Sequence, residues 1–193
     1  MDIFHAIILG IVEGVTEFLP VSSTGHLILA SHVLKLPETE FLKTFEISIQ
    51  LGAILSVVLL YWRRLLLDVE TLKRVVISFL PAAGIGLLLY KSIKALLGSE
   101  TTVIWALFLG GLVLILFEYF HREKENAQED IANMPYKTAF LIGLFQSLAM
   151  IPGVSRSGAT IVGGLLLGLK RTAIVEFSFL LAVPTMAAAT GLD

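Results

Sequence analysis

The stretch EGVTEFLPVSSTGH, residues 13–26, places two carboxylates, three consecutive hydroxyls and a histidine between apolar flanks. IFHAIILGIV precedes it and LILA follows it. Pro20 cannot continue a helix, because its ring removes a backbone donor and clashes with the preceding turn. Ser22, Ser23 and Thr24 are residue types that begin helices, because their hydroxyls accept from free backbone N–H groups. We therefore expect two short helices joined by a polar break.

The rest of the chain has the composition of a membrane protein. Of its 193 residues, 56% are hydrophobic and 16% are charged, whereas about a quarter of a soluble domain is charged. The net charge of −2 gives no support for binding nucleic acid. The lack of cysteine excludes disulfides and thiolate metal sites. We predict an all-α, polytopic membrane protein made of one integral membrane domain, residues 1–193.

Four segments are apolar over the roughly 20 residues that a membrane-spanning helix needs. They are residues 41–61, 75–97, 102–120 and 172–192. Two other regions, residues 2–34 and 136–170, each consist of two short apolar halves around a polar break. Non-helical backbone at membrane depth must be buried in protein or line a wet cavity. We therefore interpret both regions as re-entrant helix pairs.

The two broken regions resemble each other. At an offset of 133, five residues of the first fall on similar residues of the second. Gly10, Glu13, Val21, Ser22 and Gly25 match Gly143, Gln146, Val154, Ser155 and Gly158. Three predicted spans separate the regions, so the second copy should be inverted, an arrangement that places substrate sites at the midplane. We expect repeat one over about residues 1–120, and repeat two over about 134–193, truncated by roughly 60–70 residues at its C-terminus.

The basic residues predict an orientation in the membrane. Nine of them fall in the predicted loops 62–74, 121–137 and 170–171, against four on the other side. The positive-inside rule places the nine in the cytoplasm. The first broken region then enters the membrane from outside and the second from the cytoplasm.

Glu13 and Glu17 are four residues apart, so they share one face of a helix. A carboxylate inside a membrane is by default a functional candidate. Two of them can hold a divalent cation, share one proton, or act as a general base. The alternative is that both lie at a wet interface.

The hydroxyls and the histidine suggest an anion site with a nucleophile. Ser22, Ser23 and Thr24 lie at the positive end of a predicted helix, where free N–H groups bind anions. His26 follows within one turn, and a hydroxyl near an imidazole can be an activated nucleophile, or the histidine can itself attack or donate a proton. The alternative is a helix cap beside a hydrogen-bonded histidine.

The second break reads MIPGVSRSGATIVGG, residues 150–164. Ser155, Ser157 and Thr160 again supply hydroxyls at a predicted helix start. Arg156 carries a permanent, planar charge that binds phosphate oxygens bidentately, and the alternative is a structural Arg–Glu pair. Together the two breaks predict a site for phosphate or diphosphate, whose lipid surroundings suggest an attached acyl or prenyl chain.

These residues closely resemble those of a known family, the bacterial undecaprenyl-diphosphate phosphatases or bacitracin-resistance proteins. The resemblance covers essentially the whole chain and rests on residues 13–26, 45–58 (FEISIQLGAILSVV), 152–160 (PGVSRSGAT) and 176–184 (EFSFLLAVP). It implies an enzyme of the bacterial inner membrane with inverted repeats and two re-entrant helix pairs. That enzyme hydrolyses undecaprenyl diphosphate to the monophosphate and phosphate, which recycles the lipid carrier for peptidoglycan and gives bacitracin resistance.

The resemblance also implies roles for the residues of both breaks. It implies an active site toward the periplasmic side, with a divalent cation, Mg²⁺ or Ca²⁺, on Glu13 and Glu17. The residues expected to be catalytic are Glu13, Glu17, Ser23, His26 and Arg156. Those expected to bind substrate are Ser22, Thr24, Ser155, Ser157 and Thr160. Family members are longer at the C-terminus, by about the amount that the repeat predicts.

The nucleophile and the exact activity leave alternatives open. Lipid phosphatases of the phosphatidic-acid type carry a histidine six residues after their arginine, where this chain has Val162. We therefore favour a Ser23–His26 partnership, with attack by His26 or by water as the other choices. The expected partners are a polyprenyl diphosphate and membrane lipid, with a homodimer also compatible. A transporter, or flippase, of a prenyl or other lipid phosphate is the alternative function, since inverted repeats with broken helices are typical of transporters.

Overall fold

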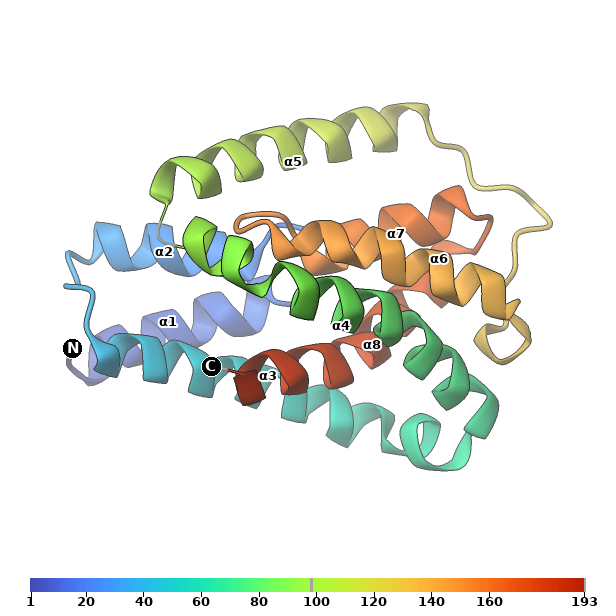
Figure 1. Ribbon diagram of the computed structural model, residues 1–193, viewed down its shortest axis with the longest axis horizontal. Coiled ribbons are helices and arrows are strands. Elements are labelled where there is room, and N and C mark those ends of the chain that lie inside the picture. Colours follow the sequence, from blue (N-terminus) through green and yellow to red (C-terminus); the bar gives the residue numbers. More distant parts are fainter. Residues whose placement is uncertain (98, 193) are drawn as a thin grey trace.

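The computed structural model describes residues 1–97 and 99–192 of an all-α protein (Figure 1). Its α-helices are α1 (Ile3–Thr16), α2 (Ser23–Val33), α3 (Glu40–Leu67), α4 (Val69–Leu97), α5 (Glu100–Phe120), α6 (Tyr136–Gln146), α7 (Arg156–Leu166) and α8 (Arg171–Leu192). Two short 3₁₀ turns, η1 (Ile131–Asn133) and η2 (Ser147–Met150), flank α6. Within the described residues, the only β-type pairing is an isolated bridge between Gln128 and Leu169.

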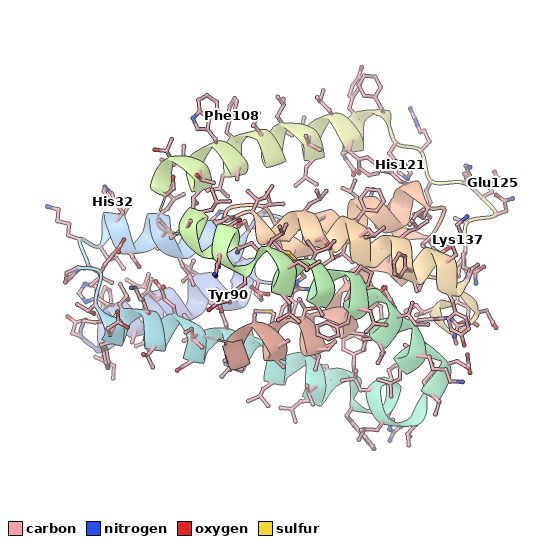
Figure 2. The ribbon with its side chains drawn as sticks, viewed as in Figure 1. His32, Tyr90, Phe108, His121, Glu125 and Lys137 are labelled. Atoms are coloured by element: carbon pink, nitrogen blue, oxygen red, sulfur yellow. The ribbon has the colours of Figure 1, made fainter. Side chains whose placement is uncertain are left out.

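Four helices, α3, α4, α5 and α8, are long and apolar enough to cross a membrane. They contain the four spans that the sequence predicts, so the prediction of an all-α, multi-pass membrane protein is confirmed. Helix α5 shows the reason most clearly, because large side chains such as Phe108 and Ile115 are exposed along it. Figure 2 shows Phe108 directed away from the rest of the molecule, as expected of a side chain solvated by lipid.

The segment predicted as a loop, residues 62–74, is mostly helical, but α3 does have a kink where the predicted span ends, at Tyr61, whose φ of −110° and ψ of 19° are not helical. Helix α3 continues to Leu67 and α4 begins at Val69, so only Asp68 separates them. The basic residues Arg63 and Arg64 therefore lie in a short helical segment that follows the kink and ends at Leu67. A helix satisfies its own backbone hydrogen bonds in water as well as in lipid, so it can continue past the membrane boundary.

Asp68 stabilises this tight connection. The backbone N–H and the hydroxyl of Thr71 donate to its carboxylate at 3.0 and 2.7 Å, and Arg64 donates to it at 3.1 Å. Arg64 also contacts Glu176 of α8 at 3.2 Å. The end of α3 is therefore fixed to both neighbouring long helices.

The two broken regions are pairs of short helices, as the sequence predicts. Helices α1 and α2 are joined by residues 17–22, and α6 is joined to α7 through η2 and residues 151–155. In Figure 1 both pairs lie in the middle of the molecule, between α5 on one side and α3 on the other. The long helices thus surround the two breaks.

Two clusters of buried apolar residues hold this arrangement together. The larger one joins α4, α6, α7 and α8, and its fully buried members include Ile142, Ile174, Phe177, Leu180 and Leu181. The smaller one consists of Leu9, Leu27 and Leu42, which connect α1, α2 and α3. Helix α4 also approaches α6 closely, since the hydroxyl of Ser78 donates to the carbonyl of Ala139.

Candidate active site

The structure brings the two polar breaks into contact, although they are far apart in the chain. The hydroxyl of Ser157 donates to the carbonyl of Leu19 at 2.7 Å. A Cβ placed on Gly158 would lie 3.4 Å from the carbonyl oxygen of Pro20. The start of α7 therefore packs directly on the turn between α1 and α2, and the two breaks form one site.

Arg156 lies at the centre of this site. Its Nη2 donates to Glu17 Oε1 at 2.6 Å and lies 3.5 Å from the sulfur of Met186, while its Nη1 donates to the carbonyl of Ser178 at 3.0 Å. The side chains of Arg156 and Glu17 are 13% and 6% exposed. This is the Arg–Glu pair that the sequence left as one alternative, and it joins α7 to the end of α1.

Ser23 binds the same carboxylate from the other side. Its hydroxyl donates to Glu17 Oε2, while Arg156 donates to Oε1. Glu17 terminates α1 and Ser23 begins α2, so the turn between the helices folds the serine back onto the acid. One buried carboxylate thus accepts hydrogen bonds from both the arginine and the serine.

Glu13 differs from Glu17 in having no donor. It is fully buried, and neither carboxylate oxygen has a hydrogen-bond partner among the described residues. It lies one helical turn before Glu17, and the two carboxylates are close enough to interact. A buried acid without a donor costs free energy unless something else satisfies it. Carboxylate oxygens are ligands that Mg²⁺ and Ca²⁺ prefer, so Glu13 and Glu17 could supply two ligands of a divalent cation, although the described residues contain no group of three or more acidic, histidine or cysteine side chains that could hold one.

His26 is oriented by the backbone. Its Nδ1 lies 2.9 Å from the carbonyl oxygen of Ser22, so a proton on Nδ1 makes this hydrogen bond and leaves Nε2 as an acceptor. Nε2 has no recorded partner in the described part of the chain. The expected Ser23–His26 partnership is not among the hydrogen bonds of this state, in which Ser23 donates to Glu17. It therefore stays a prediction.

The remaining hydroxyls mostly have structural partners. Ser22 and Ser155 cap α2 and α7, Thr160 donates to the carbonyl of Arg156 at 2.8 Å, and Ser157 binds the other break. Thr24 is exposed at the start of α2. The substrate-binding roles expected for these five residues stay predictions.

Sequence reasoning missed the contribution of α8. The carbonyl of Ser178 accepts from Arg156 Nη1, and the sulfur of Met186 contacts Nη2, the nitrogen that also binds Glu17. Phe179, next to Ser178, packs edge-on against Phe18 with ring centroids 5.1 Å apart, and Phe18 follows Glu17. The stretch EFSFLLAVP was the part of the sequence that pointed to α8. The contact of Arg156 with the carbonyl of Ser178 could not be predicted from it, because every residue type has a backbone carbonyl.

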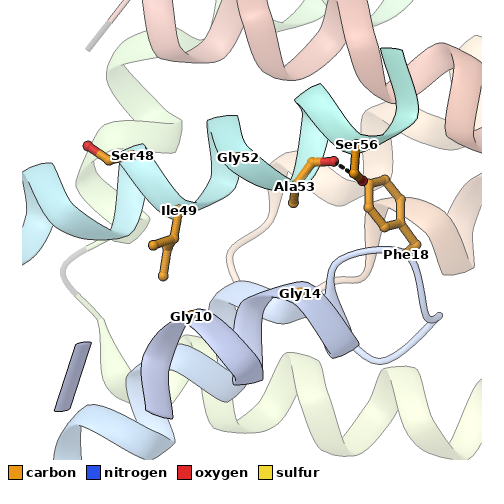
Figure 3. A pocket seen from close by; sticks show the side chains of 8 residues that line it. All are labelled: Gly10, Gly14, Phe18, Ser48, Ile49, Gly52, Ala53 and Ser56. Carbon is orange, nitrogen blue, oxygen red and sulfur yellow. Dashed lines mark hydrogen bonds between the residues drawn. The ribbon is translucent and has the colours of Figure 1, made fainter. Parts of the chain in front are cut away.

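A groove of about 580 Å³ runs between α1 and α3 and reaches the site at Phe18. Figure 3 shows Gly10 and Gly14 on α1 facing Ile49, Gly52 and Ala53 on α3, with Phe18 near one end. The glycines leave space that larger side chains would fill. The groove therefore gives an apolar region beside the polar site.

Comparison with known proteins identifies the family of the chain. The family model described as bacitracin resistance protein BacA matches residues 6–193. The chain belongs to this family. The chain is similar to proteins named undecaprenyl-diphosphatase from Wolinella succinogenes (58% identical over 193 residues) and Aquifex aeolicus (55% over 194 residues), with all of this chain and 75% of each relative covered. A third, from Persephonella marina, is 58% identical over all of this chain and 76% of the relative. The predicted family resemblance is confirmed.

Proposed function

We propose that the chain is an undecaprenyl-diphosphatase, which releases phosphate from undecaprenyl diphosphate and leaves the monophosphate. Relatives of that name are 55–58% identical to it over its whole length. This activity would recycle the lipid carrier for cell-wall synthesis and give resistance to bacitracin. The bacterial relatives and the four apolar helices support a place in the bacterial inner membrane.

One observation carries this proposal within the structure. Arg156 of the second break and Ser23 of the first converge on one carboxylate, Glu17. A guanidinium and a hydroxyl placed to bind two carboxylate oxygens can equally bind two oxygens of a phosphate group. The apolar groove beside Phe18 gives the prenyl chain a path toward lipid.

The proposed reaction uses Ser23 as the nucleophile. Its oxygen attacks the terminal phosphorus, the bond from that phosphorus to the bridging oxygen breaks, and undecaprenyl phosphate leaves. His26 Nε2 accepts the serine proton and returns it to the leaving phosphate. Water then attacks the phosphorus of the phosphoserine and gives a proton to His26 Nε2. The bond from phosphorus to the serine oxygen breaks, His26 returns the proton to that oxygen, and inorganic phosphate leaves. Arg156 and the N-termini of α2 and α7 stabilise the charge on the transferred phosphoryl group, which is the main catalytic task in such a transfer.

A divalent cation, Mg²⁺ or Ca²⁺, would be held by Glu13 and Glu17. The lack of any donor to Glu13 among the described residues supports this assignment. When bound, the cation would neutralise the charge of the diphosphate oxygens. The residues of the chain would orient those oxygens against Arg156.

We further propose that both helix pairs are re-entrant and belong to inverted repeats, the first over about residues 1–120 and the second over about 134–193. Helices α1, α2, α6 and α7 have 14, 11, 11 and 11 residues, and a crossing needs about 20. The excess of basic residues in the predicted loops supports which helix ends face the cytoplasm, and a site that opens toward the periplasmic side is what the family resemblance implies.

Release of phosphate from a prenyl diphosphate in detergent micelles tests the proposal. A phosphatase acts there, whereas a transporter has no membrane across which to move its substrate. We expect release in the presence of Mg²⁺ or Ca²⁺, and its loss in Ser23→Ala. Binding of the lipid without any release of phosphate by the wild-type chain would favour the transporter.

A further inference from the structure

Glu17 makes the contacts that a bound phosphate group would need. Its Oε1 accepts from Arg156 and its Oε2 accepts from Ser23. Its side chain is only 6% exposed, so no anion can approach Arg156 on that side while Glu17 stays in place. The arginine has two further contacts, with Ser178 and Met186, which fix its direction without neutralising its charge.

We propose that Glu17 occupies the phosphate position in the substrate-free protein and must turn away from Arg156 before a phosphate group binds. This inference rests on the proposed function, because it describes how the same site changes between its empty and its occupied state. Glu17 is then an internal competitor of the substrate, held by the same donors.

The displaced carboxylate needs a new partner. A phosphate on Arg156 would lie next to Glu17, and two buried anions repel each other strongly. Glu13 lies one turn away and has no donor among the described residues, so moving Glu17 toward it adds a second repulsion unless a cation joins them. In that arrangement Glu13 and Glu17 would hold a divalent cation, whose charge would offset both repulsions and leave Arg156 and Ser23 free for the phosphate.

The consequence is a coupling between the cation and the phosphate. Each ligand favours the arrangement in which Glu17 has left Arg156, so each should tighten the binding of the other. Linkage requires that the cation tightens phosphate binding by the same factor by which phosphate tightens cation binding. Coupling of this kind is typically about 5–150-fold. Loss of the Glu17 carboxylate should remove the competition and the coupling together.

The experiment is a titration of the full chain in micelles with inorganic phosphate, followed by ³¹P NMR, without and with Mg²⁺. For the wild type we expect Mg²⁺ to tighten phosphate binding about tenfold or more. For Glu17→Ala we expect phosphate to bind about tenfold more tightly than to the wild type when Mg²⁺ is absent, and Mg²⁺ to add little. Glu17→Gln keeps the size of the side chain and should shift phosphate binding in the same direction by a smaller factor.

Glu176→Gln is the matched control. Glu176 is a half-buried carboxylate of α8 that pairs with Arg64 at 3.2 Å, and its recorded contacts do not include Arg156 or Glu13. The substitution removes one negative charge, as the Glu17 substitutions do, and we expect wild-type phosphate binding. Equal tightening in Glu176→Gln, or no tightening in either Glu17 variant, would overturn the inference.

Hydrolysis measured on the same samples separates this inference from the proposed function. A wild-type chain that binds phosphate and Mg²⁺ cooperatively but releases no phosphate from a prenyl diphosphate would contradict only the proposed function. A chain that hydrolyses the lipid, while phosphate binding is unchanged in both Glu17 variants, would contradict only the role given to Glu17.

Discussion

The helix pair α1–α2 and the helix pair α6–α7 are built alike but carry different chemistry. In each, a serine caps the second helix by accepting from the N–H of a glycine three residues later, at 3.4 Å for Ser22 and 3.1 Å for Ser155. The residue after the cap is Ser23 in the first pair and Arg156 in the second. A shared backbone arrangement therefore presents a hydroxyl from one side of the site and a guanidinium from the other.

The buried polar residue before each break shows the same division. Gln146 is 2% exposed and bonds to Thr185 at 3.1 Å, whereas Glu13, at the matching position, has no donor among the described residues. The second pair satisfies its amide within the protein. The first keeps an acid unsatisfied, which is costly for folding and useful only if a ligand completes it. Under the proposed function, the first pair would supply the reacting and cation-binding groups, and the second would supply the arginine that binds the phosphate charge.

Arg156→Ala should have the largest effect, because it removes the full positive charge that the second pair places in the site. We expect phosphate release from a prenyl diphosphate to fall by about 10³-fold, on the scale of other electrostatic groups that act on a transition state. Arg156→Lys should restore little, since an ammonium cannot make the same bidentate contact. A wild-type rate of phosphate release in Arg156→Ala would contradict the proposal that Arg156 binds the phosphate charge.

Glu13→Gln places in the first helix pair the residue type that the second pair has at the matching position, Gln146. We expect phosphate release to fall by about 10²-fold and to lose its dependence on Mg²⁺, because one of two carboxylate ligands is gone. The measurement is the rate of phosphate release as a function of Mg²⁺ concentration. An unchanged Mg²⁺ dependence would remove Glu13 from the cation site.

Gln146→Glu is the reciprocal exchange and should act on stability. The new carboxylate would be buried beside Thr185 with no basic partner in the recorded contacts of Gln146. We expect the free energy of unfolding to fall by about 2–3 kcal/mol, as measured by SDS titration from mixed micelles. A protein as stable as the wild type would mean that the second pair also tolerates a buried acid.

How much of this comparison the sequence predicts depends on the physical origin of each feature. Apolar length predicts the long helices because lipid requires it, and Pro20 with the hydroxyls after it predicts the first break. The basic residues near position 64 follow a kink in α3 at Tyr61, as the predicted end of the span implies, but the residues after the kink are helical and do not form a loop. The contact of Ser178 with Arg156 is not predictable, because any residue type supplies a carbonyl. The contact of Ser23 with Glu17 depends on the turn between them, in which Ser22 has φ of 64°.

Gly143→Ala and Gly10→Ala test the packing of the two pairs. A Cβ on Gly143 would meet the backbone carbonyl of Ser78 and lie 3.1 Å from Pro81 Cγ, whereas one on Gly10 would meet nothing within 4 Å. We expect Gly143→Ala to lower the free energy of unfolding by about 2 kcal/mol through overpacking. Gly10→Ala should instead raise it by up to about 1 kcal/mol, because alanine favours a helix over glycine. Equal effects at both positions would show that α4 does not fix α6 as closely as the structure indicates.

Replacement of the two capping serines by glycine should have the smallest effects and opposite signs. Ser22 has a positive φ of 64° and Ser155 an ordinary φ of −70°. Glycine at a cap position costs only a few tenths of a kcal/mol relative to serine, but at position 22 it also relieves a backbone conformation that costs a side-chain-bearing residue about 1 kcal/mol. We therefore expect Ser22→Gly to raise the free energy of unfolding by about 0.5 kcal/mol and Ser155→Gly to lower it by a similar amount, in the same SDS titration. A loss of stability in Ser22→Gly as large as that in Ser155→Gly would mean that the turn holding Ser23 against Glu17 is unstrained, and that the two caps differ only in the residue that follows them.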